Sequence, residues 1–184
     1  MITTRALPTG YDTREAVALL NRTQGVGLFE DDYVARRLGR DDALALAAFE
    51  GERFVGVSVI ERIDDFAYHA PFDRGLPAEL AGRRVASFTT LAVVEDRQGQ
   101  GIGRRLCRER LGWARERGFE VVLGVSWVSG LAHTSDRTFE KSGFRAVNRL
   151  ADFYHDSSLA KPFDCPGCHV IPCTCAAVLY RLDL

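Results

Sequence analysis

The sequence lacks the features of a membrane-spanning or strongly charged chain. Its longest nearly unbroken apolar run covers residues 43–49, far short of the roughly 18 residues that spanning a bilayer requires. The N-terminus has no apolar signal-peptide core. Lys and Arg together number 24 against 25 Asp and Glu, so no global basic field favours nucleic acid or an anionic membrane. We therefore expect a cytoplasmic protein with neither nucleic-acid nor membrane partners.

Internal repeats and low-complexity tracts are also absent, and the composition does not shift along the chain. The 184 residues are 46% hydrophobic and 27% charged, which is enough apolar material for one substantial core. We expect a single domain over residues 1–184.

The order of predicted elements is that of a mixed α/β protein. Strand patterns cover residues 2–7, 44–50, 53–63, 85–93, 119–127, 144–156 and 176–182. Helix patterns cover residues 12–23, 31–38, 104–118 and 136–141. Gly51-Glu52 predicts an antiparallel hairpin, whereas the helix between residues 85–93 and 119–127 predicts a parallel strand pair. The polar stretch 64–84, marked by Pro and Gly, is long enough to predict a functional loop.

A glycine-rich turn joins the strand at residues 85–93 to the basic helix that follows. Gly99, Gly101 and Gly103 allow a ligand to approach the backbone, and a helix N-terminus points N–H groups and a positive dipole end at it. These features predict a phosphate site. Neither the Rossmann G-x-G-x-x-G spacing nor the Gly-Lys-Ser/Thr of a P-loop is present. Nearby cations are Arg97, Arg104 and Arg105.

The pattern that does fit is Gln98-x-x-Gly101-x-Gly103, placed directly after an apolar strand and opening a helix. The stretch 91–106 resembles the acetyl-CoA pyrophosphate loop of the GNAT superfamily of N-acetyltransferases. Phe-Glu-Lys-Ser-Gly-Phe at residues 139–144 is similar to a second signature of that family. The predicted order of elements also resembles the family fold throughout.

This resemblance implies the acyl-CoA N-acyltransferase fold, a mainly antiparallel mixed sheet with a splayed central parallel strand pair. It implies that an acetyl group passes from acetyl-CoA to a primary amine by direct attack in a ternary complex. The acceptor is a small molecule or a peptide, and a homodimer remains open. The implied cofactor-binding residues are Leu91, Ala92, Val93, Arg97, Gln98, Gly99, Gln100, Gly101, Ile102, Gly103 and Arg104.

The proton-transfer groups are not assigned by the resemblance. The family's usual tyrosine acid falls on Phe139, and the strand 85–93 has no glutamate, which the family often carries there as a base. Catalysis then rests mostly on positioning, or the chain is a CoA-binding module without turnover. Individually weak candidates for proton transfer are Glu61, His69, His133, Ser135 and Tyr154.

The cysteines need a separate account, because nothing in the resemblance predicts them. Cys107 follows the apolar spacing of its helix and is expected to be buried. The other four, Cys165, Cys168, Cys173 and Cys175, lie within a predicted hairpin insert at about residues 157–175. Four thiols, or three with His169, can close a structural Zn²⁺ site. A redox dithiol, c-type haem attachment through Cys165-x-x-Cys168-His169, unliganded thiols and a zinc-knuckle interaction protein remain as alternatives.

Overall fold

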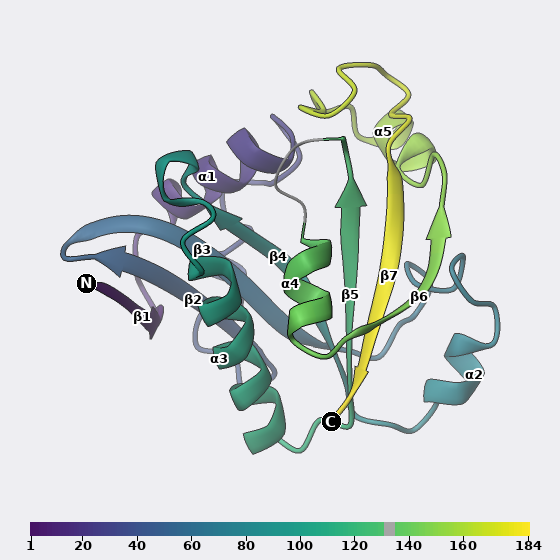
Figure 1. The fold of residues 1–184 in the computed structure, drawn as a ribbon, viewed down its shortest axis with the longest axis horizontal. Helices are drawn as coiled ribbons and strands as arrows, with labels where there is room; N and C mark the ends of the chain where they lie inside the picture. Colours follow the sequence, from purple (N-terminus) through teal and green to yellow (C-terminus); the bar gives the residue numbers. More distant parts are fainter. Residues whose placement is uncertain (131–134) are drawn as a thin grey trace.

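The computed structural model describes residues 1–130 and 135–184, and its centre is a seven-stranded sheet in the order β1-β2-β3-β4-β5-β7-β6 (Figure 1). The strands are β1 Ile2–Ala6, β2 Ala43–Glu50, β3 Arg53–Ile63, β4 Val85–Val93, β5 Val121–Val128, β6 Arg145–Leu150 and β7 Ala176–Asp183. The helices are α1 Arg14–Gln24, α2 Leu76–Leu80, α3 Ile102–Glu116, α4 Asp136–Lys141 and α5 His155–Ala160. Short 3₁₀ turns occupy Ala35–Arg37 and Glu95–Arg97.

The pairing of β4 with β5 is the parallel one, and the other neighbouring strands of the sheet run antiparallel. The parallel ladder extends only from Val85 opposite Val121 to Phe88 opposite Gly124. Beyond it the register of β4 against β3 shifts, and Thr89 is left without a paired residue, as in a β-bulge. The two strands then separate. The predicted fold class, with its splayed central pair, is confirmed.

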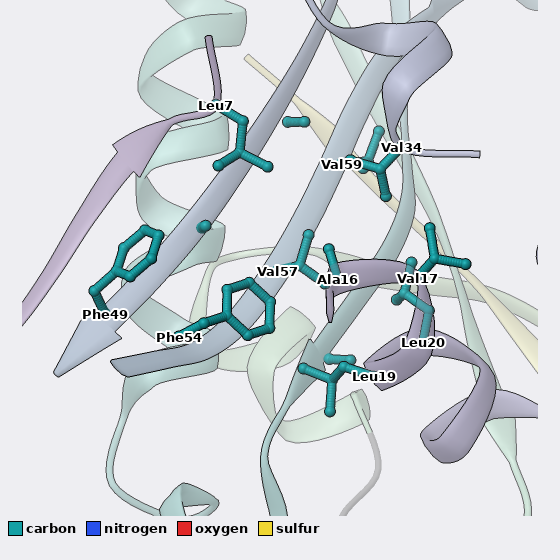
Figure 2. Packing of buried hydrophobic residues seen from close by; sticks show 13 residues of the cluster. Leu7, Ala16, Val17, Leu19, Leu20, Val34, Phe49, Phe54, Val57 and Val59 are labelled. Carbon is teal, nitrogen blue, oxygen red and sulfur yellow. The ribbon is translucent and has the colours of Figure 1, made fainter. Parts of the chain in front are cut away.

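Side chains alternate along the central strands, so the sheet has two buried faces. Ala45, Ala47 and Phe49 of β2 belong to one apolar cluster with α1, and Leu46 and Ala48 belong to another with α3. Figure 2 shows the first cluster, in which Val57 and Val59 of β3 face the helix α1. Because helices cover both faces, most residues in the middle of these strands are buried.

The predicted elements agree with the structure except in three places. The stretch 64–84 contains the short helix α2, and the predicted helix 31–38 is reduced to the 3₁₀ turn at Ala35–Arg37. The predicted strand 144–156 is wrong beyond Leu150. There Asp152 adopts a positive φ of 49°, which turns the chain, and the Ser157 hydroxyl donates to the Tyr154 carbonyl in the first turn of α5. The cysteine segment does connect the antiparallel strands β6 and β7, as predicted, but it consists of a helix followed by a loop.

Among the described residues, none of the helices combines the length and the apolar character needed to cross a membrane.

Candidate functional site

A cleft of about 1610 Å³ opens where β4 and β5 separate. Residues 87–93 of β4 and Val125 and Trp127 of β5 line it, together with the glycine turn that leads into α3. Residues from the loop after β3, from the end of α1, from α4 and the residue before it, and from the segment between β6 and β7 also form part of its wall. All the residues that the sequence predicts as cofactor contacts, from Leu91 to Arg104, line this cleft.

The glycine turn has the geometry that an anion site needs. Gly99 and Gly101 have positive φ values of 73° and 82°, which favour glycine, and Gly101 is the N-cap of α3. No side chain caps the first amides of α3, so its N-terminal N–H groups are not satisfied by a capping residue. A fifteen-residue helix adds its dipole to these amides. The turn can therefore hold a pyrophosphate at its backbone.

The three predicted phosphate cations differ in their surroundings. Arg104 is exposed and lines the cleft. Arg97 also lines it, but its guanidinium already donates to the Glu50 carboxylate at 2.8 Å. Arg105 points to the other side of α3, where it donates to the Ile2 carbonyl at 2.6 Å. Of the three, only Arg104 is placed for a phosphate without giving up an ion pair.

Backbone carbonyls along the open part of β4 are held by side chains. Gln98 Nε2 donates to the Val93 carbonyl at 3.0 Å, and Gln24 Nε2 donates to the Leu91 carbonyl at 3.1 Å. From α3, Arg110 Nη1 donates to the carbonyls of Val59 and Thr90 at 3.0 and 3.2 Å, and these two residues are paired with each other next to the bulge. These contacts fix the shape of β4 at the place where it leaves β5.

Arg110 is a residue that the sequence analysis missed. Its side chain is 2% exposed, its guanidinium lies 3.6 Å from the centre of the Phe88 ring, and burial lowers its pKa to about 10. The sequence does contain a feature that indicates it: a charged residue lies at the helical spacing of Leu106, Leu111 and Ala114, all of which are buried. A cation on an apolar helix face indicates a buried partner.

Phe139 lines the cleft and is 6% exposed. Its ring stacks on Tyr180 with 4.9 Å between centroids and an angle of 10°. A Cβ at position 124 would lie 2.5 Å from Phe139 Cζ, so Gly124 of β5 makes room for this ring. The position of the usual acid thus holds a tightly packed apolar side chain.

The remaining catalytic candidates are dispersed. Glu61 is not among the cleft-lining residues, and its carboxylate accepts from Arg37 at 2.7 Å. Ser135 lines the cleft, with its hydroxyl donating to Ser126 Oγ at 2.8 Å. Tyr154 also lines it, and burial raises its pKa well above the ordinary value. His133 lies outside the described residues.

Of the candidates that the structure describes, His69 is the most buried. It is 4% exposed and lines the cleft, and neither ring nitrogen has a hydrogen-bond partner among the described residues. Burial lowers its pKa to about 4, although the carboxylate of Asp65 opposes the shift. Near neutral pH the ring is therefore uncharged and able to accept a hydrogen bond.

The four cysteines of the predicted insert come together. The Sγ atoms of Cys165, Cys168, Cys173 and Cys175 all lie within 4.8 Å of one another, and we call them the four-cysteine cluster. His169 does not belong to it, because its side chain is 69% exposed and its Nδ1 lies 3.3 Å from Asp164 Oδ1. Cys107 is buried in α3 as predicted and donates to Ser142 Oγ at 3.2 Å. The four-cysteine cluster has the ligand set for one metal ion.

Solved structures share the fold over the whole chain. Arabidopsis thaliana NAA60 in complex with acetyl-CoA is 16% identical, with a TM-score of 0.73 over 100% of this chain and 99% of that one. The ribosomal-protein-S18-alanine N-acetyltransferase from Escherichia coli is 16% identical, with a TM-score of 0.66 over 100% and 94%. The IAA acetyltransferase from Bacillus cereus is 19% identical, with a TM-score of 0.63 over 100% of both chains.

The family of this chain is shown by its sequence and not by these distant structural similarities. No curated protein matches the chain significantly in sequence. The model of the acetyltransferase (GNAT) family, however, matches residues 14–144, which span α1 through α4 and include the glycine turn. The chain therefore belongs to the GNAT family of acetyltransferases, whose members transfer an acetyl group from acetyl-CoA.

Proposed function

We propose that residues 1–184 act as a single domain that transfers the acetyl group of acetyl-CoA to a primary amine by direct attack in a ternary complex. The observation that carries this proposal is the cleft itself. On one side it has the uncapped N-terminus of α3 behind the glycine turn, and on the other it has a wall built from separate loops. Donor and acceptor can therefore be bound at the same time.

Acetyl-CoA occupies the first half in this proposal. Its pyrophosphate lies on the amides of residues 99–104, with Arg104 as the added cation. The Val94 amide donates to Val55 of β3, so strand alternation turns the N–H groups of Leu91 and Val93 toward the open edge of β4. These N–H groups are suited to the amides of the pantetheine arm, which would extend β4 as an added strand does.

The acceptor enters from the other side, past the loop after β3 and the segment before β7. Asp65 lines that wall and supplies a negative charge near His69. This fits an acceptor that arrives as an ammonium ion. The E. coli relative named above is an alanine N-acetyltransferase of ribosomal protein S18, which supports a peptide amine as a candidate beside a small molecule.

The chemical step relies mainly on positioning. The bound ammonium ion first loses a proton to water, and the neutral nitrogen then attacks the thioester carbonyl. The carbon–sulfur bond breaks as the tetrahedral intermediate collapses, and the second amine proton passes to water, to which uncharged His69 can offer a hydrogen-bond acceptor. The leaving thiolate takes a proton from water or from the hydroxyl of Ser135 or Tyr154. Because a thiol has a pKa near 8.5, a strong acid is not required, and holding both substrates together supplies several kcal/mol of the barrier reduction.

We also propose that the four-cysteine cluster binds one structural Zn²⁺. Three of its Sγ–Sγ distances are 3.6, 3.6 and 3.7 Å. Four thiolates at the usual Zn–S distance of about 2.3 Å would be about 3.8 Å apart in a tetrahedron. The reducing cytoplasm that we propose as the location keeps such thiols available to a metal.

The test is thiol release by the purified protein with acetyl-CoA and a panel of small-molecule and peptide amines. We expect release that depends on one class of amine. Gly101→Val should abolish it, because a branched side chain disfavours φ of 82° and enters the phosphate site. Ser135→Ala and Tyr154→Phe should each lower kcat less than about tenfold if positioning dominates.

Phe139→Tyr is the matched test of the missing acid. A positional mechanism predicts that the added hydroxyl changes kcat by less than about threefold. A rise of a hundredfold or more would show that acid catalysis was limiting, because a positioned acid contributes about 10²–10⁴. Acetyl-CoA binding without thiol release from any amine would favour a CoA-binding module without turnover.

A further inference from the structure

The four-cysteine cluster lies in a segment that has little other support. Residues 161–175, which we call the cysteine loop, contain no helix or strand. Its buried side chains are Phe163, Cys165, Cys173 and Cys175, so the thiols make up most of its small apolar cluster. Without a metal this loop would have only that cluster and a few hydrogen bonds to hold it. With a metal, four of its fifteen positions would be fixed to one point.

The cysteine loop is attached to the segment that follows α1. Val26 and Asp164 form an isolated antiparallel bridge, in which each amide donates to the other's carbonyl at 3.0 Å. Lys161 Nζ donates to the Leu28 carbonyl at 3.1 Å and lies 3.4 Å from Glu30 Oε1. We call residues 25–30 and the cysteine loop together the arch. In Figure 1 the cysteine loop lies beyond the C-terminal end of β5, on the side of α1.

The packing on both sides of the bridge is close. A Cβ at Gly25 would lie 2.7 Å from the Phe163 ring. A Cβ at Gly167, inside the Cys165-x-x-Cys168 turn, would lie 2.8 Å from the Trp127 ring at the end of β5. The turn between Cys165 and Cys168 therefore packs directly on β5, which forms one side of the cleft. A shift of this turn would also move Phe163 and the bridge.

The arch also lines the cleft. Leu28 and Phe29 contribute from one side of the bridge, and Phe163, Pro166 and Cys173 contribute from the other. Cys173 is at once a member of the four-cysteine cluster and a residue of the cleft wall. The glycine turn at residues 98–104 belongs to a different part of the wall, between β4 and α3.

We propose that the metal in the four-cysteine cluster clamps the arch and thereby sets the acceptor half of the cleft, while the acetyl-CoA half is independent of it. This inference rests on the acetyl-transfer function proposed above. The metal is structural, with four thiolates and no open position, and takes no part in the chemical step. Binding releases the thiol protons, and removal by a chelator restores thiols without any change in oxidation state.

The experiment compares the zinc-loaded chain with the same chain after treatment with a strong chelator, under reducing conditions. Metal analysis should give one zinc per chain, and Co²⁺ in its place should give the visible spectrum of a tetrahedral thiolate site. On zinc removal, hydrogen exchange at the Val26 and Asp164 amides should rise at least tenfold. The protection that acetyl-CoA gives to residues 98–104 should not change.

Kinetics supply a second readout. Zinc removal should raise KM for the amine at least tenfold and leave KM for acetyl-CoA within twofold. Cys168→Ser should behave like the chelated chain, because Cys168 is a cluster member that does not line the cleft. His169→Ala is the matched control in the same loop, and should keep both the zinc and the kinetic constants.

Three results would overturn the inference: no bound metal, unchanged exchange at the bridge after metal removal, or equal loss of acetyl-CoA binding as the whole chain unfolds. If no amine is acetylated, the proposed function fails by itself, and the exchange measurement still decides the role of the metal.

Discussion

His69 lines the cleft, and the burial of its side chain also affects the stability of the fold. Its ring is 4% exposed, faces the cleft and has no hydrogen-bond partner among the described residues. Desolvation is the main cause of its low pKa, because burial penalises the imidazolium form. The same burial that keeps the ring neutral for an amine makes its protonation costly to the fold.

The resulting pH dependence has a definite sign. The pKa of His69 falls from 6.5 to about 4 in the folded chain, so between these values the unfolded state binds more protons. The stability that neutral His69 contributes is present above pH 6.5 and is lost as the pH falls toward 4. This amounts to about 3 kcal/mol. The unfolding free energy of wild-type protein should fall by this amount between pH 7 and pH 4, and His69→Leu should not show this part of the fall. Urea titration at each pH measures the unfolding free energy.

Leu159→Ala is the control for this measurement, because Leu159 is exposed and carries no titratable group. It should leave the pH dependence almost unchanged. If the unfolding free energy depends on pH with the same slope in wild-type and His69→Leu protein, then His69 is hydrated and not buried in solution.

At the scale of elements, the contact between α3 and the bulge of β4 holds the cleft open. The parallel ladder ends at Phe88, and the carbonyls of Val59 and Thr90, which are paired with each other next to the bulge, both accept from Arg110. The Phe88 ring stacks under the same guanidinium. A buried cation thus adds hydrogen-bond donors at the place where the ladder becomes irregular.

Arg110→Met should therefore destabilise the chain by about 2–4 kcal/mol, because two buried carbonyls lose their donor and the Phe88 contact is lost. We also expect weaker acetyl-CoA binding, since residues 89–93 of β4 line the cleft. Denaturant unfolding and titration calorimetry measure the two effects. Arg108→Met, at an exposed position of the same helix, should change neither. If Arg110→Met protein is destabilised but binds acetyl-CoA with unchanged affinity, then the bulge does not contribute to cofactor binding.

At the scale of the whole molecule, the sheet consists of two parts joined at the short ladder between β4 and β5. Strands β1 to β4 form one part, and β5, β7 and β6 form the other. Acetyl-CoA in the cleft would contact both parts and act as a further connection between them. The cofactor should therefore stabilise the entire fold and not just the glycine turn.

Acetyl-CoA at 100 times its Kd should raise the unfolding free energy by about 2.7 kcal/mol. For a chain of 184 residues this corresponds to a rise in Tm of roughly 5–10 °C, measured by scanning calorimetry. Acetate at the same concentration should have no effect. A Tm that does not respond to acetyl-CoA would contradict binding in this cleft.

The sequence alone determined the glycine turn and the start of the helix that follows it. Residues 91–104 act locally: the strand, the glycine turn and the helix start are continuous in the chain, so their geometry follows from nearby residues. The order of helices and strands along the chain followed as well, because apolar periodicity and turn residues report on local backbone structure. The predicted strand 144–156 was overextended, because the turn at Asp152 depends on a local φ that the apolar pattern does not report.

Only the tertiary structure decided the rest. Glu61 is taken up by an ion pair with Arg37, and Arg110 reaches carbonyls of two strands that are distant in sequence. The bridge between Val26 and Asp164 also joins segments that are far apart along the chain. Such contacts depend on how elements pack in three dimensions, which no local pattern of residues encodes. The glycine turn and the closely spaced cysteines were therefore readable from the sequence, whereas the walls of the cleft away from the turn required the folded structure.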